Sequence, residues 1–129
     1  MRTIRLLLML VIAIAVLPII SCSKKEGPTS VIQYEIEDFD NYFTLVKYSD
    51  EAGNMVTIDN PANFPGGTKT ISVNAKPFTA VLEAKVNNTT NATRNYVLRI
   101  IVDGKIMTFE NLQVMPFTIG SATAQFTVN

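Results

Sequence analysis

The sequence predicts an all-β protein: a single antiparallel, Ig-like β-sandwich of seven or eight strands over residues 31–129, preceded by a helical signal peptide. Three observations predict this fold. Apolar and polar residues alternate with a period of two in several short runs, turn-forming residues separate these runs, and no stretch of ten residues after Val31 has helical periodicity. A segment of about 100 residues can bury one hydrophobic core but not two, so we expect one domain.

The first 21 residues differ in composition from the rest of the chain. Sixteen of them are hydrophobic, none is acidic, and the basic start contains Arg2 and Arg5. The apolar run 6–17 would span about 18 Å as a helix, well short of the roughly 30 Å of hydrocarbon that a membrane-spanning helix crosses. A basic start, a short apolar run and a small residue before Cys22 predict a signal peptide over residues 1–21.

The predicted cleavage site contains the only cysteine of the chain. Ile19, Ile20, Ser21 and Cys22 resemble the lipobox of bacterial lipoproteins, which has an aliphatic residue, a small residue and then an obligatory cysteine. This resemblance implies that the Cys22 thiol carries a diacylglyceryl group, that cleavage occurs before Cys22, and that the new amino group takes an acyl chain such as palmitate. Several acyl chains make a stable membrane anchor. The alternative is an ordinary signal peptide, or a short signal anchor, in which Cys22 has no role.

Residues 22–30 predict a flexible tether between lipid and domain, because they are polar, contain Gly27 and Pro28, and lack periodicity. Ser23 rather than Asp follows the cysteine, so the resemblance implies no inner-membrane retention signal. We therefore expect a lipid-anchored protein of the bacterial cell envelope, in the outer membrane, on its periplasmic or surface face. Without residues 1–21, 9 basic and 11 acidic residues remain, a net charge of −2.

The strands follow in order along the chain. Ile32, Tyr34 and Ile36 alternate with polar residues and predict the first strand, and the apolar segment 43–48 predicts a second strand buried on both faces. The turn residues of 50–54 lead into a strand at 55–58, and breakers at 59–61 and 65–67 enclose a loop. Further strands are expected at 70–73, 78–86, 96–102, 105–109 and 121–128.

Two of these segments give the clearest signals. In 78–86, one face consists of four apolar residues at alternate positions, namely Ala80, Leu82, Ala84 and Val86. Between 96–102 and 105–109, the dipeptide Asp103-Gly104 favours the positive φ angles that a type I′ turn requires. We therefore expect a tight hairpin with Asp103 and Gly104 as its structural turn.

The composition excludes several classes of function. There is no histidine, so no imidazole base, Ser-His-Asp triad or histidine metal ligand exists. One cysteine allows neither an intrachain disulfide nor a thiolate metal cluster. A formal net charge of zero argues against nucleic-acid binding, which needs a basic surface. We expect a protein that is not an enzyme and that has no cofactor and no metal.

Acidic residues gather at two places. Glu35, Glu37, Asp38 and Asp40 lie near the first strand, where alternation puts Glu35 and Glu37 on one face. They suit a solvated strand face, with a carboxylate pair or calcium ligands as the alternative. The second group is Ser49, Asp50, Glu51 and Asn54, whose residue types a turn requires for its backbone; a metal site is again the alternative.

Two further segments offer contact surfaces. Residues 87–93 contain three overlapping Asn-x-Thr sequences and predict a polar hairpin loop in which Asn and Thr cap their own backbone, with glycosylation as the alternative in a eukaryotic protein. Val97 and Ile101 make the strand 96–102 apolar on both sides, and Leu112, Val114, Met115 and Phe117 do not alternate cleanly around Pro116. We expect a central strand covered on both faces, or a loop tucked under the sandwich; an exposed patch for a partner or an acyl chain is the alternative.

The order of landmarks resembles the MmpS-like family of small membrane-anchored β-sandwich proteins. The resembling segments are Tyr34-Glu35-Ile36, residues 46–53, Leu82 with Ala84, residues 101–105 around Asp103-Gly104, and Ala122 with Ala124. The family is usually anchored by a helix, whereas this chain has Cys22. Mycobacterial members accompany large RND-type lipid exporters, so the resemblance implies an envelope protein partner and a transporter accessory role. A module that binds a small lipid, glycan or peptide ligand is the alternative.

Overall fold

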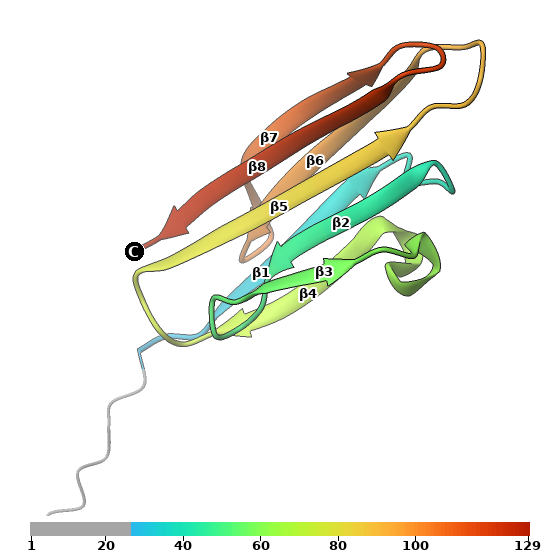
Figure 1. Ribbon diagram of the computed structural model, residues 1–129. Helices are drawn as coiled ribbons and strands as arrows, with labels where there is room; N and C mark the ends of the chain where they lie inside the picture. Colours follow the sequence, from blue (N-terminus) through green and yellow to red (C-terminus); the bar gives the residue numbers. More distant parts are fainter. Residues whose placement is uncertain (1–26) are drawn as a thin grey trace, which may run out of the picture.

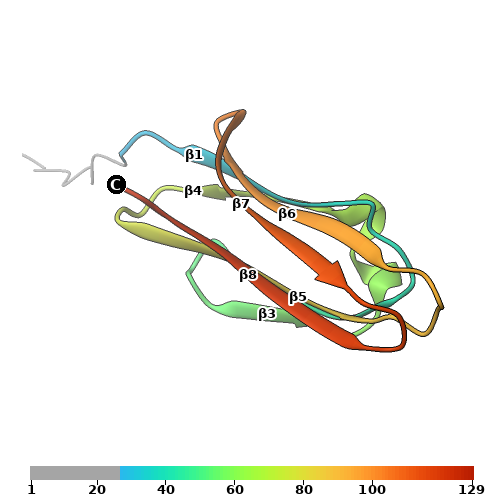
Figure 2. The ribbon, with the colours of Figure 1, turned by 90° about the horizontal axis from the view of Figure 1, so that it is seen from above.

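A computed structural model describes residues 27–129 and contains eight strands in two facing antiparallel sheets (Figures 1 and 2). This confirms the predicted β-sandwich. The predicted signal peptide, the lipobox 19–22 and Cys22 lie outside the described residues. The strands are β1 (Ser30–Glu37), β2 (Phe43–Ser49), β3 (Met55–Ile58), β4 (Thr68–Val73), β5 (Phe78–Asn87), β6 (Arg94–Val102), β7 (Lys105–Val114) and β8 (Ile119–Val128).

One sheet has the strand order β4-β1-β6-β7 and the other has the order β3-β2-β5-β8. Only β2–β3 and β6–β7 are hairpins within a sheet, so every other connection passes from one sheet to the other. Two short 3-10 turns, η1 (Pro61–Asn63) and η2 (Pro65–Gly67), lie in the connection between β3 and β4. No helix among residues 27–129 is long and apolar enough to cross a membrane.

The core lies between the sheets and follows the predicted alternation. On β5, Ala80, Leu82, Ala84 and Val86 all have 0% exposure. They face the equally buried inner side chains of β1 and β6, namely Ile32, Tyr34, Ile36, Leu98 and Ile100. Because apolar burial is the main favourable term in folding, this single continuous layer of side chains holds the two sheets together.

The predicted hairpin turn at Asp103 and Gly104 is confirmed. The two residues have φ angles of 50° and 82°, as a type I′ turn requires, and the turn joins β6 to β7. Asp103 also ties this turn to the first strand: its backbone N–H donates to the Val31 carbonyl, and its carboxylate accepts the Val31 N–H, each at 2.8 Å.

Three expectations about strands and loops are wrong. The segment 43–48 is not buried on both faces, because a bulge between Phe43 and Leu45 turns Phe43, Val46 and Tyr48 to the same inner side. The Asn-Thr segment 88–93 is not a hairpin loop, since β5 and β6 belong to different sheets. β7 continues to Val114, beyond the predicted end at 109.

The sandwich has two ends, which differ in their connections (Figure 1). The N-terminal end contains residues 27–30, the turn 50–54, the connection 74–77, the turn 103–104 and the C-terminal residue Asn129. The loop end contains the connections 38–42, 59–67, 88–93 and 115–118. The Asn-Thr segment and the loop 59–67 therefore lie at the same end, opposite the point where the predicted tether joins β1.

Candidate functional site

Three large apolar side chains are exposed where β7 turns into β8. Met115 is 55%, Phe117 71% and Ile119 61% exposed, and we call these three residues the apolar tip. Phe117 has a φ of +55°, a left-handed conformation that is uncommon for a bulky side chain. A large aromatic residue that is both exposed and held in this conformation contributes little to the core, so it is a candidate for contact with a partner.

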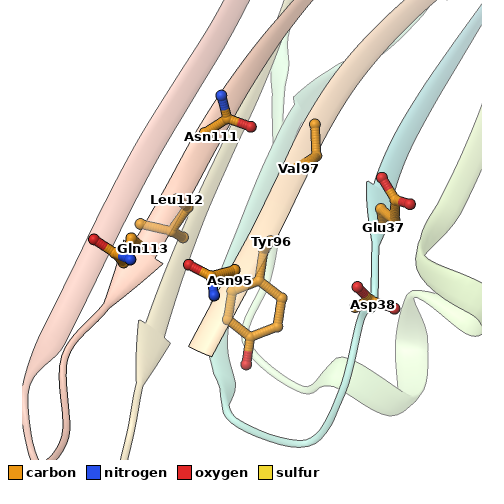
Figure 3. A pocket seen from close by; sticks show the side chains of 8 residues that line it. All are labelled: Glu37, Asp38, Asn95, Tyr96, Val97, Asn111, Leu112 and Gln113. Carbon is orange, nitrogen blue, oxygen red and sulfur yellow. The ribbon is translucent and has the colours of Figure 1, made fainter. Parts of the chain in front are cut away.

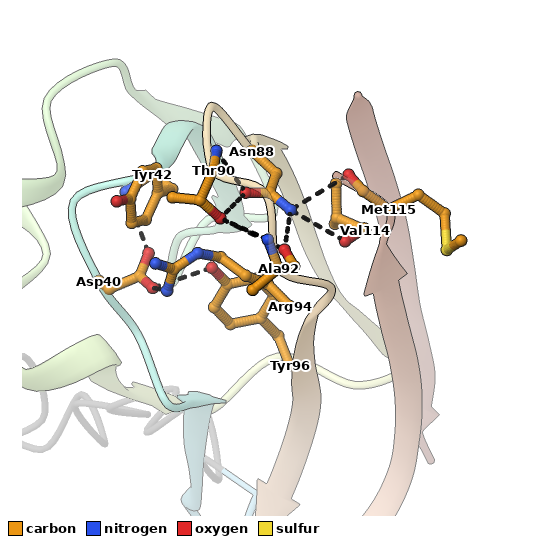
Figure 4. Close-up of polar contacts among 9 residues, drawn as sticks. All are labelled: Asp40, Tyr42, Asn88, Thr90, Ala92, Arg94, Tyr96, Val114 and Met115. Atoms are coloured by element: carbon orange, nitrogen blue, oxygen red, sulfur yellow. Dashed lines mark hydrogen bonds and ion pairs between the residues drawn. The ribbon is translucent and has the colours of Figure 1, made fainter. Parts of the chain in front are cut away.

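The apolar tip is held by Asn88, which is completely buried (Figure 4). The Asn88 side-chain nitrogen lies 2.8 Å from the Ala92 carbonyl oxygen and 3.1 Å from those of Val114 and Met115, and it donates to them. The Asn88 side-chain oxygen accepts from the backbone N–H and the hydroxyl of Thr90. One amide group thus fixes the segment 88–93 to the end of β7.

Beside this network lies a cluster of Asp40, Tyr42, Arg94 and Tyr96 (Figure 4). The Arg94 guanidinium and the Tyr96 hydroxyl each donate to the same Asp40 carboxylate oxygen at 2.9 Å. Arg94 also lies over the Tyr42 ring, 3.8 Å from its centroid, which is a cation–π contact. The cluster connects the segment 38–42 to the start of β6, so two connections of the loop end are fixed to each other.

The protonation of this cluster follows from its surroundings. Burial, helped by the neighbouring Asp40 carboxylate, raises the pKa of Tyr96 to about 12, so its hydroxyl keeps its proton at neutral pH. Burial opposes the charge on Arg94, but Asp40 and the two tyrosines outweigh it and raise the pKa of Arg94 above its ordinary value. All donors are therefore in the state that holds Asp40 in place.

Aromatic rings hold the third connection of the loop end. Phe39 stacks against Phe43 and Phe64 with ring centroids 4.5 and 5.5 Å away, and Phe64 is only 1% exposed. Gly67 lies directly beneath them: a Cβ there would come within 2.6 Å of the Ile36 carbonyl oxygen and of Phe39 Cβ. The loop 59–67 is therefore packed closely onto the end of β1.

A hollow of about 440 Å³ opens at the loop end of the β4-β1-β6-β7 sheet (Figure 3). Its lining combines carboxylate and amide side chains with a few apolar ones: Glu37, Asp38, Asn95, Tyr96, Val97, Asn111, Leu112 and Gln113. Amides and carboxylates together can donate to and accept from the hydroxyl groups of a sugar or the backbone of a peptide. This hollow therefore offers a place for a small polar ligand.

The first predicted acidic group is divided between two places. Glu35 and Glu37 share the outer face of β1, as predicted, and both form ion pairs with Arg99 of β6. The Glu35 carboxylate lies 2.7 Å from the Arg99 guanidinium. Asp40 instead belongs to the loop-end cluster with Arg94. The four carboxylates thus do not converge on one site.

The second predicted group forms a turn. The Asp50 carboxylate accepts the backbone N–H groups of Ala52 and Asn54 at 3.0 and 2.8 Å. Ser49 is buried, and its hydroxyl accepts from the Val81 N–H and donates to the Thr79 carbonyl. Within residues 27–129, no group of three or more acidic or cysteine side chains could hold a metal ion.

The outer face of β6 is not covered by any of the described residues, so the expectation of a strand covered on both faces is wrong. β6 is central, as expected, between β1 and β7. Its half-buried residues Val97 and Ile101 continue into the exposed Val31 of β1 and into Ile106 and Phe109 of β7, which are 52% and 57% exposed. We call these five residues the outer patch.

Sequence reasoning missed Asn88 and Arg94 as organising residues. Asn88 was part of the predicted polar loop, but its partners Val114 and Met115 lie 26 and 27 residues away. Arg94 lies 54 residues from Asp40. A single sequence contains no signal for such pairs.

No protein-family model matches this chain, and no curated protein matches it.

Proposed function

We propose that the protein is a lipid-anchored, non-enzymatic component of the bacterial cell envelope that binds another envelope protein through its loop end. The predicted acylated Cys22 would attach it to the membrane. The MmpS-like resemblance favours a transport protein as the partner, with this chain as its accessory.

One observation carries the proposal: the apolar tip of Met115, Phe117 and Ile119 is exposed, while the backbone beneath it is hydrogen-bonded to the segment 88–93. Exposed apolar side chains that cluster on a well-ordered surface are typical of protein–protein contacts. The buried Asn88 network fixes the backbone below the tip, so little conformational entropy would be lost on binding. The tip lies opposite the N-terminal end, which would leave it accessible to a partner when the tether is attached to a bilayer.

Two observations support a non-enzymatic role. The chain contains no histidine, and its single cysteine is the predicted acylation site. The carboxylates that share a face, Glu35 and Glu37, are both paired with Arg99. The Arg99 guanidinium therefore occupies the carboxylate oxygens that a substrate would have to reach.

The test is photo-crosslinking in intact cells that express the native chain. A photoreactive amino acid replaces Phe117 in one variant and the exposed Gln125 on β8 in the matched control. We expect position 117 to crosslink to one defined envelope protein, position 125 not to do so, and the Cys22→Ala variant to lose the crosslink. Recovery of only abundant lipoproteins at both positions would overturn the proposal.

The amide-lined hollow favours a second function, the binding of a small glycan or peptide. This function predicts that a ligand raises the melting temperature of the protein and that Asn111→Leu abolishes the shift. The control is Asn91→Leu, which changes an exposed amide outside the hollow. A panel of glycans and peptides without any shift would exclude this second function.

A further inference from the structure

We infer that the outer patch rests on the surface of the lipid bilayer, so that the β4-β1-β6-β7 sheet lies with its outer face against the membrane. The inference rests on the proposed acylation of Cys22 and adds an orientation to it. The occupant of the patch would be the headgroup and upper acyl region of the lipids.

The composition of the patch suits such a surface. Ile106 and Phe109 are more than half exposed, and with Val97, Arg99 and Asn111 they line a depression of about 300 Å³. Ile101 lies opposite Ile106 in the ladder, and Val31 lies at the start of β1 beside the hairpin turn. Apolar side chains presented together on one face are what an interfacial membrane contact requires.

The chain itself brings this patch to the membrane. Val31 is part of the patch and is only nine residues from Cys22. Nine residues reach at most about 30 Å when fully extended, and as a flexible chain they span about 17 Å on average. A patch held so close to the bilayer meets it at a high effective concentration, so weak apolar contacts are sufficient to orient the domain.

The charges around the patch are compatible with lipid headgroups. Lys105 directly follows the hairpin turn, and Lys24 and Lys25 lie in the predicted tether. On the same face, Glu35 and Glu37 are both paired with Arg99, and the Asp103 carboxylate accepts the Val31 N–H. The exposed acidic residues Glu51 and Glu110 belong to the β2–β3 turn and to the opposite face of β7. Arg99 balances only one of Glu35 and Glu37, and the Asp103 carboxylate keeps its charge, so the contact depends on the apolar side chains and the anchor and not on attraction to anionic headgroups.

The test uses the full chain, expressed in a bacterial host, purified with its lipid and reconstituted into vesicles of phosphatidylethanolamine and phosphatidylglycerol. Acylation leaves no free thiol at Cys22, so one new cysteine can carry an environment-sensitive dye. The dye is placed at Ile106→Cys, or at Ile119→Cys as a control of similar exposure at the loop end. Lipids brominated near the top of the acyl chain act as the quencher.

We expect brominated lipid to reduce the emission of the dye at position 106 by at least about twofold and to leave that at position 119 unchanged. Adding Phe109→Glu should restore the emission at position 106 while the chain stays bound to the vesicles. Circular dichroism verifies that each variant is folded.

The remaining outcomes separate the inference from the proposed function. Equal emission at positions 106 and 119 on vesicle-bound protein overturns the bilayer contact and leaves the anchor intact. If the dye at position 106 is shielded from water but not quenched, a protein such as a second copy covers the patch. This result also overturns the bilayer contact. A purified chain without acyl groups on Cys22 overturns both the bilayer contact and the proposed lipid anchor.

Discussion

The two ends of the sandwich are closed by different kinds of interaction. At the N-terminal end closure is mostly local: the Asp50 carboxylate accepts from backbone N–H groups two and four residues away, and Asp103-Gly104 is a two-residue turn whose distant partner is Val31. At the loop end, side chains bridge segments that are distant in sequence, as in Asn88 with Val114 and Arg94 with Asp40. The turn 50–54 needs only its local sequence, whereas the bridges of the loop end exist only once the whole domain is folded.

This difference implies that substitutions should cost more at the loop end. The turn 50–54 can relax without affecting other segments, since the hydrogen bonds of Asp50 are internal to it. When a buried bridge such as Asn88 is lost, several hydrogen bonds between distant segments are lost with it. Equivalent changes at the two ends therefore test the comparison directly.

The largest effect is expected when alanine replaces a glycine at each end. Gly67→Ala at the loop end should lower the free energy of unfolding by about 4 kcal/mol, because its φ is +68° and a Cβ would collide with the Ile36 carbonyl and Phe39. Gly104→Ala, with φ +82° and open space around it, should cost only about 1 kcal/mol. Urea denaturation measures the free energy of unfolding of both variants. Similar losses for Gly67→Ala and Gly104→Ala would contradict the proposed difference between the two ends.

Removal of the Asn88 side chain should have the next largest effect. Asn88→Ala removes five hydrogen bonds of a fully buried side chain, three donated to the carbonyls of Ala92, Val114 and Met115 and two accepted from Thr90, and the expected loss is about 3 kcal/mol. The matched control is Asn91→Ala in the same segment, where the side chain is exposed and a change within about 0.5 kcal/mol is expected. Equal losses in chemical denaturation would show that Asn88 does not hold the loop end.

A third prediction concerns a buried hydrogen bond that joins the two sheets, from Tyr34 of β1 to Ser49 of β2. The Tyr34 hydroxyl donates to the Ser49 carbonyl at 2.9 Å, and burial raises the pKa of Tyr34 from 10.0 to about 12. The folded state thus holds the proton more tightly than the unfolded state. This contribution, about 2 to 3 kcal/mol, is fully present below pH 10 and is lost as the pH rises through 12.

Tyr34→Phe removes this pH dependence. At pH 7 the variant should be about 1 kcal/mol less stable than the wild type, because the hydrogen bond is missing. Between pH 10 and 12 the wild type should lose that advantage, since only the wild type must ionise Tyr34, while Tyr96 is common to both proteins. Unfolding free energies of both proteins across this range provide the measurement, and parallel curves would refute the assignment.

The smallest effect on stability is expected at the apolar tip. Phe117→Asn should change the free energy of unfolding by no more than about 0.5 kcal/mol, because Phe117 is 71% exposed and asparagine tolerates its left-handed conformation. The same variant should lose the partner crosslinks of a photoreactive residue at position 119. Loss of stability without loss of crosslinking would assign Phe117 a structural role instead.

The sequence predicted those parts of the fold that depend on neighbouring residues. The alternation of Ala80 to Val86 and the turn at Asp103 and Gly104 were both confirmed. The shared face of Glu35 and Glu37 was also predicted, because a strand places every second side chain on one side. Their partner Arg99 was not, since it lies more than 60 residues away and only the β1–β6 register brings it near.

The errors have the same physical origin. A bulge after Phe43 changes which side chains of β2 face the core, and the local sequence pattern does not indicate this bulge. The apolar outer face of β6 has the composition of a covered strand, and whether another layer covers it depends on topology alone. At the loop end, the residue types of 87–93 suggested a turn, but the pairing of Asn88 with β7 depends on how the two sheets stack.

The position of β1 has a mechanical consequence. β1 lies inside its sheet, with β4 on one side and β6 on the other, and both ladders run antiparallel to it. A pull on the chain before Ser30, resisted by a partner held at Phe117, acts along the strand axis. Because ladder hydrogen bonds lie across the strands, this load shears both ladders at once instead of opening one bond after another. A load applied between the two ends of the sandwich is therefore shared by many hydrogen bonds at the same time.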